Sequence, residues 1–260
     1  MNRLMSITAV IAIVTTATIF LCHCSKIHVS GESSAVRDSV SGSNSVVSSS
    51  DNTPTQDENK AVSIQNGFLK QDVAELTQFV NVEDLDSSVE INLKYATSDN
   101  FTGKPIYTSS VCVLRKETAT KLLAAETEFA NLGYHIKVWD AYRPLSVQKI
   151  LFAAESNTNY IADPATGSRH NRGAAVDITL VDENGNEIEM PSGFDEFTIK
   201  AHRNNPDMSK EAQNNLATLT SVMTECGFTT INDEWWHFDD SDWNNYPIMD
   251  VHLEDFADVR

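Results

Sequence analysis

The chain has 260 residues and a formal net charge of −18, from 37 acidic and 19 basic side chains. This length is enough for one or two domains. A nucleic-acid-binding protein needs a basic face, so the acidic balance argues against nucleic acid as a partner.

The first 24 residues are typical of an export signal. A short basic start, Met1–Arg3, precedes an uncharged run from Leu4 to Cys22. This pattern predicts a signal peptide or lipoprotein signal over residues 1–24. The alternative is an uncleaved membrane anchor, because the run is near the length that spans a bilayer. Cys22 and Cys24 close the run and slightly favour lipid attachment. We therefore expect an exported protein, either periplasmic or a membrane-anchored lipoprotein. It should contact the membrane only through this N-terminal anchor or lipid.

Residues 25–65 are predicted to be a disordered tether. The stretch is rich in serine and other small polar residues and has few large apolar side chains. Such a segment cannot bury enough apolar surface to offset the entropy lost on ordering. The remaining residues, 66–260, are then expected to form one catalytic domain.

The first half of this domain contains patterns for both helices and strands. Glu117–Leu132 has apolar residues at helical spacing and is followed by Gly133, which predicts a helix. Tyr134–Asp140 predicts a strand. Pro144 suits the first turn of a helix that continues through Phe152.

The second half continues the mixture. Alternate apolar residues over Val176–Leu180 predict a strand, and Asp182–Asn186 is typical of a hairpin turn. A helix is predicted to begin at Ser209 and to end before Gly227, and Thr229–Asp239 is predicted to be an aromatic strand. Because helices and strands do not alternate regularly, the pattern favours an α+β domain with an antiparallel sheet and flanking helices.

Two cysteines, Cys112 and Cys226, lie inside the predicted domain. In an exported protein such a pair is slightly more expected to form a disulfide than not. The alternative is that both are small buried apolar residues.

Two short motifs carry the candidate chemistry. The segment SRHNRGAAVD supplies His170 and Asp177, and the segment EWWH supplies Glu234 and His237. Two neutral imidazoles and one carboxylate can hold a catalytic zinc ion and leave a coordination position open for water. Glu234 can then take a proton from that water. Either motif alone is common by chance, but together they predict a metal-dependent hydrolase with one zinc ion per chain.

These motifs resemble those of the zinc D-alanyl-D-alanine dipeptidases of the VanX type, which share a fold with the hedgehog signalling domain. Three more segments resemble parts of that family: KYATSDNFTGKP at residues 94–105, VWDAYRP at residues 138–144 and MPSGFD at residues 190–195. The likeness covers about residues 70–250. It implies a hedgehog/D,D-peptidase-like fold and, as substrate, D-Ala-D-Ala or a related cell-wall peptide.

The resemblance also implies catalytic roles. The family's metal-ligand positions are occupied by His170, Asp177 and His237. Glu234 is expected to act as the general base toward water and then as the acid toward the leaving amine. Arg143 is expected to stabilise the oxyanion that forms at the scissile carbonyl; the alternative is that it is a structural partner of Asp140.

The family's substrate-contacting positions are occupied by Tyr95, Ser168 and Asp195. An anionic side chain such as Asp195 suits the free ammonium group of a dipeptide. Each of the three could instead be a turn or packing residue. Two loops, residues 156–166 and 196–208, differ from what the resemblance leads us to expect and could reshape the pocket.

The predicted function is therefore zinc-dependent hydrolysis of the D-Ala-D-Ala dipeptide by a metal-activated water. One alternative is a D,D-carboxypeptidase or endopeptidase that acts on peptidoglycan peptides through a more open groove. Another is a non-catalytic wall-binding lipoprotein, for which loss of Glu234 or a ligand would be expected, and all four residues are present.

Glu234 and His237 would lie on opposite faces of an ideal strand. The sequence therefore predicts a bulge or bend there, or a Glu234 that reaches in from beyond the strand.

Overall fold

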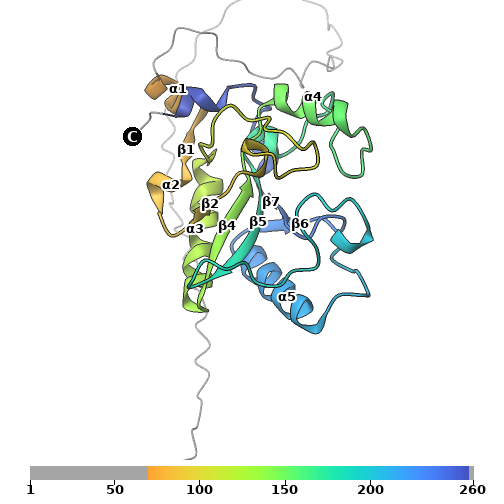
Figure 1. Cartoon of the computed structure of the whole chain (residues 1–260). Coiled ribbons are helices and arrows are strands. Elements are labelled where there is room, and N and C mark those ends of the chain that lie inside the picture. Colours follow the sequence, from red (N-terminus) through yellow and green to blue (C-terminus); the bar gives the residue numbers. More distant parts are fainter. Residues whose placement is uncertain (1–69, 258–260) are drawn as a thin grey trace, which may run out of the picture. The chain divides into compact units, whose positions relative to one another are not determined.

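The computed structural model describes residues 70–257 (Figure 1). The predicted signal over residues 1–24 and the predicted tether over residues 25–65 lie outside the described residues. Within residues 70–257, no helix combines the length and the apolar content needed to cross a membrane. The helices and strands are, in chain order, α1 (Lys70–Thr77), β1 (Phe79–Asn81), α2 (Val82–Leu85), β2 (Glu90–Ile91), β3 (Val113–Arg115), α3 (Lys116–Asn131), β4 (Tyr134–Asp140), α4 (Leu145–Ala154), β5 (Ala175–Asp182), α5 (Lys210–Glu225), β6 (Phe228–Thr230) and β7 (His237–Asp240).

The centre of the domain is a five-stranded sheet with the strand order β2-β4-β5-β7-β6 (Figure 1). Strands β4, β5, β7 and β6 pair antiparallel, whereas the edge strand β2 runs parallel to β4. The chain passes through β3 and α3 between β2 and β4, and a crossover of this length permits parallel pairing. The predicted α+β domain with an antiparallel sheet is thus confirmed, with β2 as a parallel exception.

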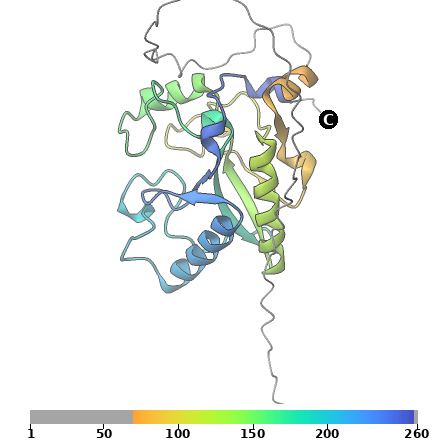
Figure 2. The ribbon, with the colours of Figure 1, turned by 180° about the vertical axis from the view of Figure 1, so that it is seen from behind.

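Helices α3 and α5 pack against the sheet, as the view from behind in Figure 2 shows. Val176, Ile178 and Leu180 of β5 are buried in the same apolar core as Leu122 and Phe129 of α3. Neighbouring residues of a strand point to opposite faces of the sheet. The intervening residue 177 therefore lies on the opposite face of the sheet from these three side chains.

The two long helices have the ends that the sequence predicts. Helix α3 ends just before Gly133, which has a φ of 82°, and α5 ends just before Gly227, which has a φ of 94°. Glycine adopts such left-handed conformations without steric cost. At the start of α5, the Ser209 side chain accepts a hydrogen bond from the backbone N–H of Ala212 at 3.0 Å.

The prediction of one continuous strand over Thr229–Asp239 is wrong. The structure divides this stretch into β6 and β7, which pair antiparallel on either side of a turn. Trp235 and Trp236 lie in that turn and are buried in the core, and the Trp235 backbone N–H donates to the Ala201 carbonyl at 3.0 Å. Aromatic residues that suggested a strand are therefore core residues of a connecting turn.

The predicted disulfide between Cys112 and Cys226 is not formed. Cys112 is buried in the apolar core, and Cys226 lies at the C-terminal end of α5. Burial raises the pKa of the Cys112 thiol well above its ordinary value, so this cysteine stays a neutral thiol. The alternative that Cys112 is a small buried residue is the one that the structure supports.

Candidate metal centre

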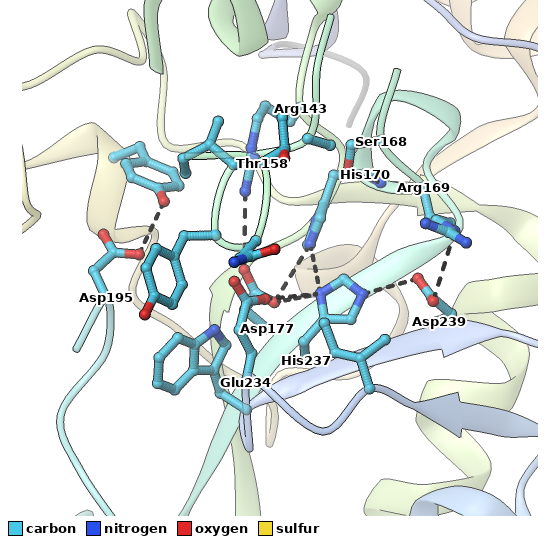
Figure 3. A pocket seen from close by; sticks show the side chains of 17 residues that line it. Arg143, Thr158, Ser168, Arg169, His170, Asp177, Asp195, Glu234, His237 and Asp239 are labelled. Carbon is cyan, nitrogen blue, oxygen red and sulfur yellow. Dashed lines mark hydrogen bonds and ion pairs between the residues drawn. The ribbon is translucent and has the colours of Figure 1, made fainter. Parts of the chain in front are cut away.

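Three predicted ligands converge in the structure. The Nε2 atom of His170, the Nδ1 atom of His237 and the Oδ1 atom of Asp177 are separated by 3.1 Å, 3.0 Å and 3.3 Å (Figure 3). All three side chains are buried. Nitrogen and oxygen ligands of a tetrahedral zinc ion, bound at about 2.0–2.1 Å, lie about 3.3 Å from one another. The spacing of these atoms therefore fits a single small cation.

The sheet register and one glycine bring these ligands together. Asp177 of β5 and His237 of β7 are direct partners across the antiparallel ladder. His170 begins a short 3₁₀ turn that ends at Gly173, whose φ is 68°. A Cβ atom at residue 173 would lie 2.4 Å from the Phe79 ring. Gly173 thus lets the chain turn back from His170 toward β5.

Hydrogen bonds at the far sides of the imidazoles fix which nitrogen of each ring faces the centre. The Nδ1 atom of His170 lies 2.7 Å from the Ala141 carbonyl oxygen, and the Nε2 atom of His237 lies 2.8 Å from Oδ1 of Asp239. Both partners are acceptors, so these ring nitrogens carry the protons. The two remaining ring nitrogens then aim lone pairs, together with a carboxylate oxygen, at one point. Three such atoms can hold a single cation, and this donor set suits zinc.

Asp239 is a residue beside this centre that the sequence reasoning missed. It lies two residues after His237 on β7, and residues two apart share a strand face. This spacing was the available signal. Its Oδ2 atom also lies 3.7 Å from Nε of Arg169, so the carboxylate joins a metal-ligand candidate to a basic side chain at the cavity wall (Figure 3).

Glu234 reaches the centre from beyond the strand. It lies in the turn before β7, and the His237 backbone N–H donates to the Glu234 carbonyl at 3.4 Å. This turn brings the Glu234 Oε2 atom to 3.9 Å from the His237 Nδ1 atom. Burial is the main cause that raises the pKa of Glu234, to about 8. A carboxyl group with such a pKa can both accept and return a proton near neutral pH.

Arg143 pairs with Asp140, as the structural alternative expects, and it also lies beside the candidate metal centre. Its Nε and Nη2 atoms donate to Oδ2 of Asp140 at 2.9 Å and 2.6 Å, and Nη1 donates to Gln148 at 2.9 Å. The same Nη2 atom lies 3.9 Å from Oδ2 of Asp177, and Arg143 lines the cavity. The charge of Asp140 holds the buried Arg143 protonated against the cost of desolvation, so its pKa lies well above the ordinary value. The guanidinium is therefore a fixed positive group beside the centre.

The three predicted substrate-contacting residues all line the cavity. The Tyr95 hydroxyl donates to Oδ1 of Asp195 at 3.1 Å. Asp195 has a φ of 56°, an uncommon backbone conformation for a residue with a side chain. Burial, followed by the nearby Asp177 charge, raises the pKa of Asp195 to about 7. The Ser168 side chain accepts from the His170 backbone N–H at 3.2 Å, so Ser168 also supports the ligand turn.

The cavity that contains these groups has a volume of about 150 Å³. Part of its wall is the loop after α4, residues 158–162, which falls in one of the two stretches where the sequence departs from the family resemblance. Tyr160 of this loop stacks on Phe197 from the second such stretch, with ring centroids 4.9 Å apart. The two stretches thus meet at the cavity.

Comparisons with known proteins agree with this geometry. Residues 75–257 match the model of the peptidase family M15 described as D-ala-D-ala dipeptidase. A D-alanyl-D-alanine dipeptidase of Escherichia coli K12 is 39% identical over 178 residues, which cover 68% of this chain and 92% of that protein. A D-alanyl-D-alanine dipeptidase of Enterococcus faecium is 32% identical over 181 residues, 62% of this chain and 90% of that one.

Among solved structures, VanYB in complex with D-alanine-D-alanine is similar at a TM-score of 0.34 and 14% identity, covering 59% of this chain and 87% of that chain. The two dipeptidases named above share a much higher sequence identity with this chain than VanYB does. The match of the family model over most of the chain, together with the Escherichia coli relative, shows that the chain is a peptidase that belongs to the D-alanyl-D-alanine dipeptidase family.

Proposed function

We propose that this peptidase hydrolyses the D-Ala-D-Ala dipeptide with one zinc ion held by His170, Asp177 and His237. The observation that carries this proposal is the convergence of three buried acceptor atoms beside Glu234 in a small cavity. The relatives named D-alanyl-D-alanine dipeptidase support the same substrate.

In this mechanism the chain's own residues move the protons and stabilise the charge. Zinc, when bound, would supply a positive charge that acidifies the attacking water and polarises the scissile carbonyl. Glu234 takes a proton from that water as the oxygen attacks the carbonyl carbon, and then returns it to the leaving amine nitrogen as the peptide bond breaks. Arg143 places a fixed positive charge beside the centre, where it stabilises negative charge on the carbonyl oxygen.

The size and charge of the cavity favour a dipeptide. Pockets for drug-sized ligands have volumes of roughly 300–1,000 Å³, whereas this cavity has about 150 Å³. Asp195 is buried at the cavity wall, where its carboxylate suits the free ammonium group of a dipeptide. A longer wall peptide would bring a neutral amide to this position and would leave Asp195 without a charged partner.

We also propose that the protein acts outside the inner membrane, in the periplasm or as a lipoprotein. This proposal is supported by the basic start and apolar run of residues 1–24. Peptides released during wall turnover would then be its source of substrate. Fractionation of cells that express the full chain tests this location, and protein recovered only from the cytoplasm would contradict it.

The experiment that tests the function is a substrate panel on the purified full-length protein supplied with zinc. It compares D-Ala-D-Ala with N-acetyl-D-Ala-D-Ala, which lacks the ammonium group, and with a wall pentapeptide that ends in D-Ala-D-Ala. We expect rapid release of D-alanine from the free dipeptide and little from the other two. Faster cleavage of the pentapeptide would identify a D,D-carboxypeptidase instead, and silence across the panel would favour the wall-binding alternative.

A further inference from the structure

The cavity is lined by two guanidinium groups that are held in different ways. The nitrogens of Arg143 donate to Asp140 and Gln148, and the side chain is buried. Arg169 also lines the cavity, but 44% of its side chain is exposed. Among the residues that the structure describes, Arg169 is therefore the one arginine that lines this cavity with a partly exposed side chain.

The contacts of Arg169 orient its guanidinium and leave donors available. Its guanidinium carbon lies 4.6 Å from the centre of the Trp243 ring, a distance typical of a cation–π contact. Its Nε atom faces Oδ2 of Asp239 at 3.7 Å, beyond hydrogen-bond distance. Across residues 70–257, no hydrogen bond uses its two terminal nitrogens. A planar pair of free N–H donors is the geometry that binds a carboxylate through both oxygens.

The charged groups of the cavity are arranged so that they complement the two charged ends of a dipeptide. Figure 3 shows Asp195 on one side of the cluster formed by His170, Asp177 and His237, and Arg169 on the other. A dipeptide carries an ammonium group at one end, a carboxylate at the other and its peptide bond between them. The cavity thus has an anionic end, a candidate metal centre and a cationic end in the same order.

We propose that Arg169 binds the C-terminal carboxylate of the substrate and makes a free carboxyl end a requirement for cleavage. This inference rests on the proposed function. It adds a specificity residue at the end of the cavity opposite Asp195 and restricts the enzyme to peptides whose last carboxyl group is unblocked. The competing interpretation is that Arg169 only restrains Asp239, and through it His237.

The experiment combines two variants with two substrates. The substitution Arg169→Gln removes the charge and keeps part of the aliphatic stem over Trp243. The matched control is Arg172→Gln, because Arg172 also lies over the Trp243 ring, at 5.4 Å, but does not belong to the cavity lining. Each full-length protein is assayed for kcat/KM with D-Ala-D-Ala and with D-Ala-D-Ala amide, in which the carboxylate is neutralised, and its zinc content and melting temperature are measured.

We expect Arg169→Gln to lower kcat/KM for D-Ala-D-Ala on the order of 10- to 100-fold, mainly through KM, because a charged hydrogen bond of ordinary strength is lost. The amide should be cleaved slowly by the unmodified enzyme and equally slowly by Arg169→Gln, with zinc content unchanged. Arg172→Gln should keep the preference of the unmodified enzyme for the free acid.

Four results would overturn the inference. A parallel loss on both substrates would show that Arg169 does not recognise the carboxylate. Loss of zinc from Arg169→Gln would show that it acts through Asp239. If the unmodified enzyme does not cleave D-Ala-D-Ala at all, the proposed function fails and the inference fails with it, whereas normal cleavage with an unaffected Arg169→Gln variant removes the inference alone.

Discussion

The two sides of the cavity are built from different kinds of structure. On one side, Asp177 and His237 are paired residues of neighbouring strands, so the sheet ladder sets their separation. On the other side, Asp195 and the loop at residues 158–162 lie outside the helices and strands. Paired strands hold side chains more rigidly than loops, which vary more easily. The comparison indicates that the sheet fixes the separation of two candidate ligands, whereas loop residues form much of the wall that a bound peptide would contact.

The largest expected effect comes from removing a strand-borne ligand. His237→Ala leaves two protein ligands, and we expect it to lose both zinc and detectable dipeptidase activity. Elemental analysis of the purified protein together with a D-alanine assay checks this outcome. His252→Ala is the matched control because His252 is exposed and lies outside the cavity. Equal zinc content in the two variants would remove His237 from the metal centre.

The next effect concerns Glu234, the proposed proton carrier, which lies in the turn between β6 and β7. Glu234→Gln should keep zinc and lose about 10²- to 10⁴-fold in kcat, which is the usual contribution of a general acid–base group. The neighbouring substitution Asp233→Asn is the control, since Asp233 is 45% exposed and does not line the cavity. A nearly unchanged kcat with full zinc occupancy would show that another group transfers the proton.

A smaller effect is expected at Asp239, where a substitution should weaken zinc binding without abolishing it. Asp239→Asn keeps an acceptor for the Nε2–H of His237 but removes the carboxylate charge. Loss of such a partner typically weakens metal binding about 10- to 100-fold. Competition with a chelator measures the zinc affinity, and Asp242→Asn, an exposed acid in the same segment, serves as control. An unchanged affinity would mean that Asp239 does not support His237.

The smallest expected effect is a pH dependence of kcat/KM that arises from Asp195, one of the loop residues of the cavity wall. The pKa of Asp195 is raised to about 7, chiefly by burial, so acidification neutralises this carboxylate before an ordinary aspartate would be protonated. Since the neutral form binds an ammonium group weakly, kcat/KM for D-Ala-D-Ala should fall as the pH decreases through about 7, and the positive charge of a bound metal ion would move the midpoint lower.

In Asp195→Asn the acidic limb that belongs to Asp195 should disappear, and KM should be high at every pH. Profiles of kcat/KM from about pH 5 to about pH 8 for both proteins make the comparison. An identical acidic limb in the variant would assign this titration to a different group.

Local patterns in the sequence were sufficient for the long elements. Helix α3, strand β4 and helix α5 follow from apolar spacing and from the glycines after each helix, because these signals depend on neighbouring residues alone. The candidate ligands also follow from two short motifs, since their residue types already restrict the chemistry. The split between β6 and β7 was missed, because Trp235 and Trp236 look like strand residues until the core that buries them is known.

Other features depended on residues that are far apart in the chain. The approach of Arg143 to Asp177 and the pairing of Tyr95 with Asp195 appear only when distant segments meet. The same is true of the missing disulfide between Cys112 and Cys226, since sequence spacing says nothing of their separation in space.

The sequence by itself thus determined the α+β class, the long helices and the residue types that can hold a metal ion and move a proton. Only the tertiary structure decided which atoms of those residues face one another, that Glu234 enters from a turn, and that Asp195 and Arg169 lie on opposite sides of the centre. The physical reason is that residue type and spacing act locally, whereas orientation, burial and charge pairing are set by segments that the fold brings together.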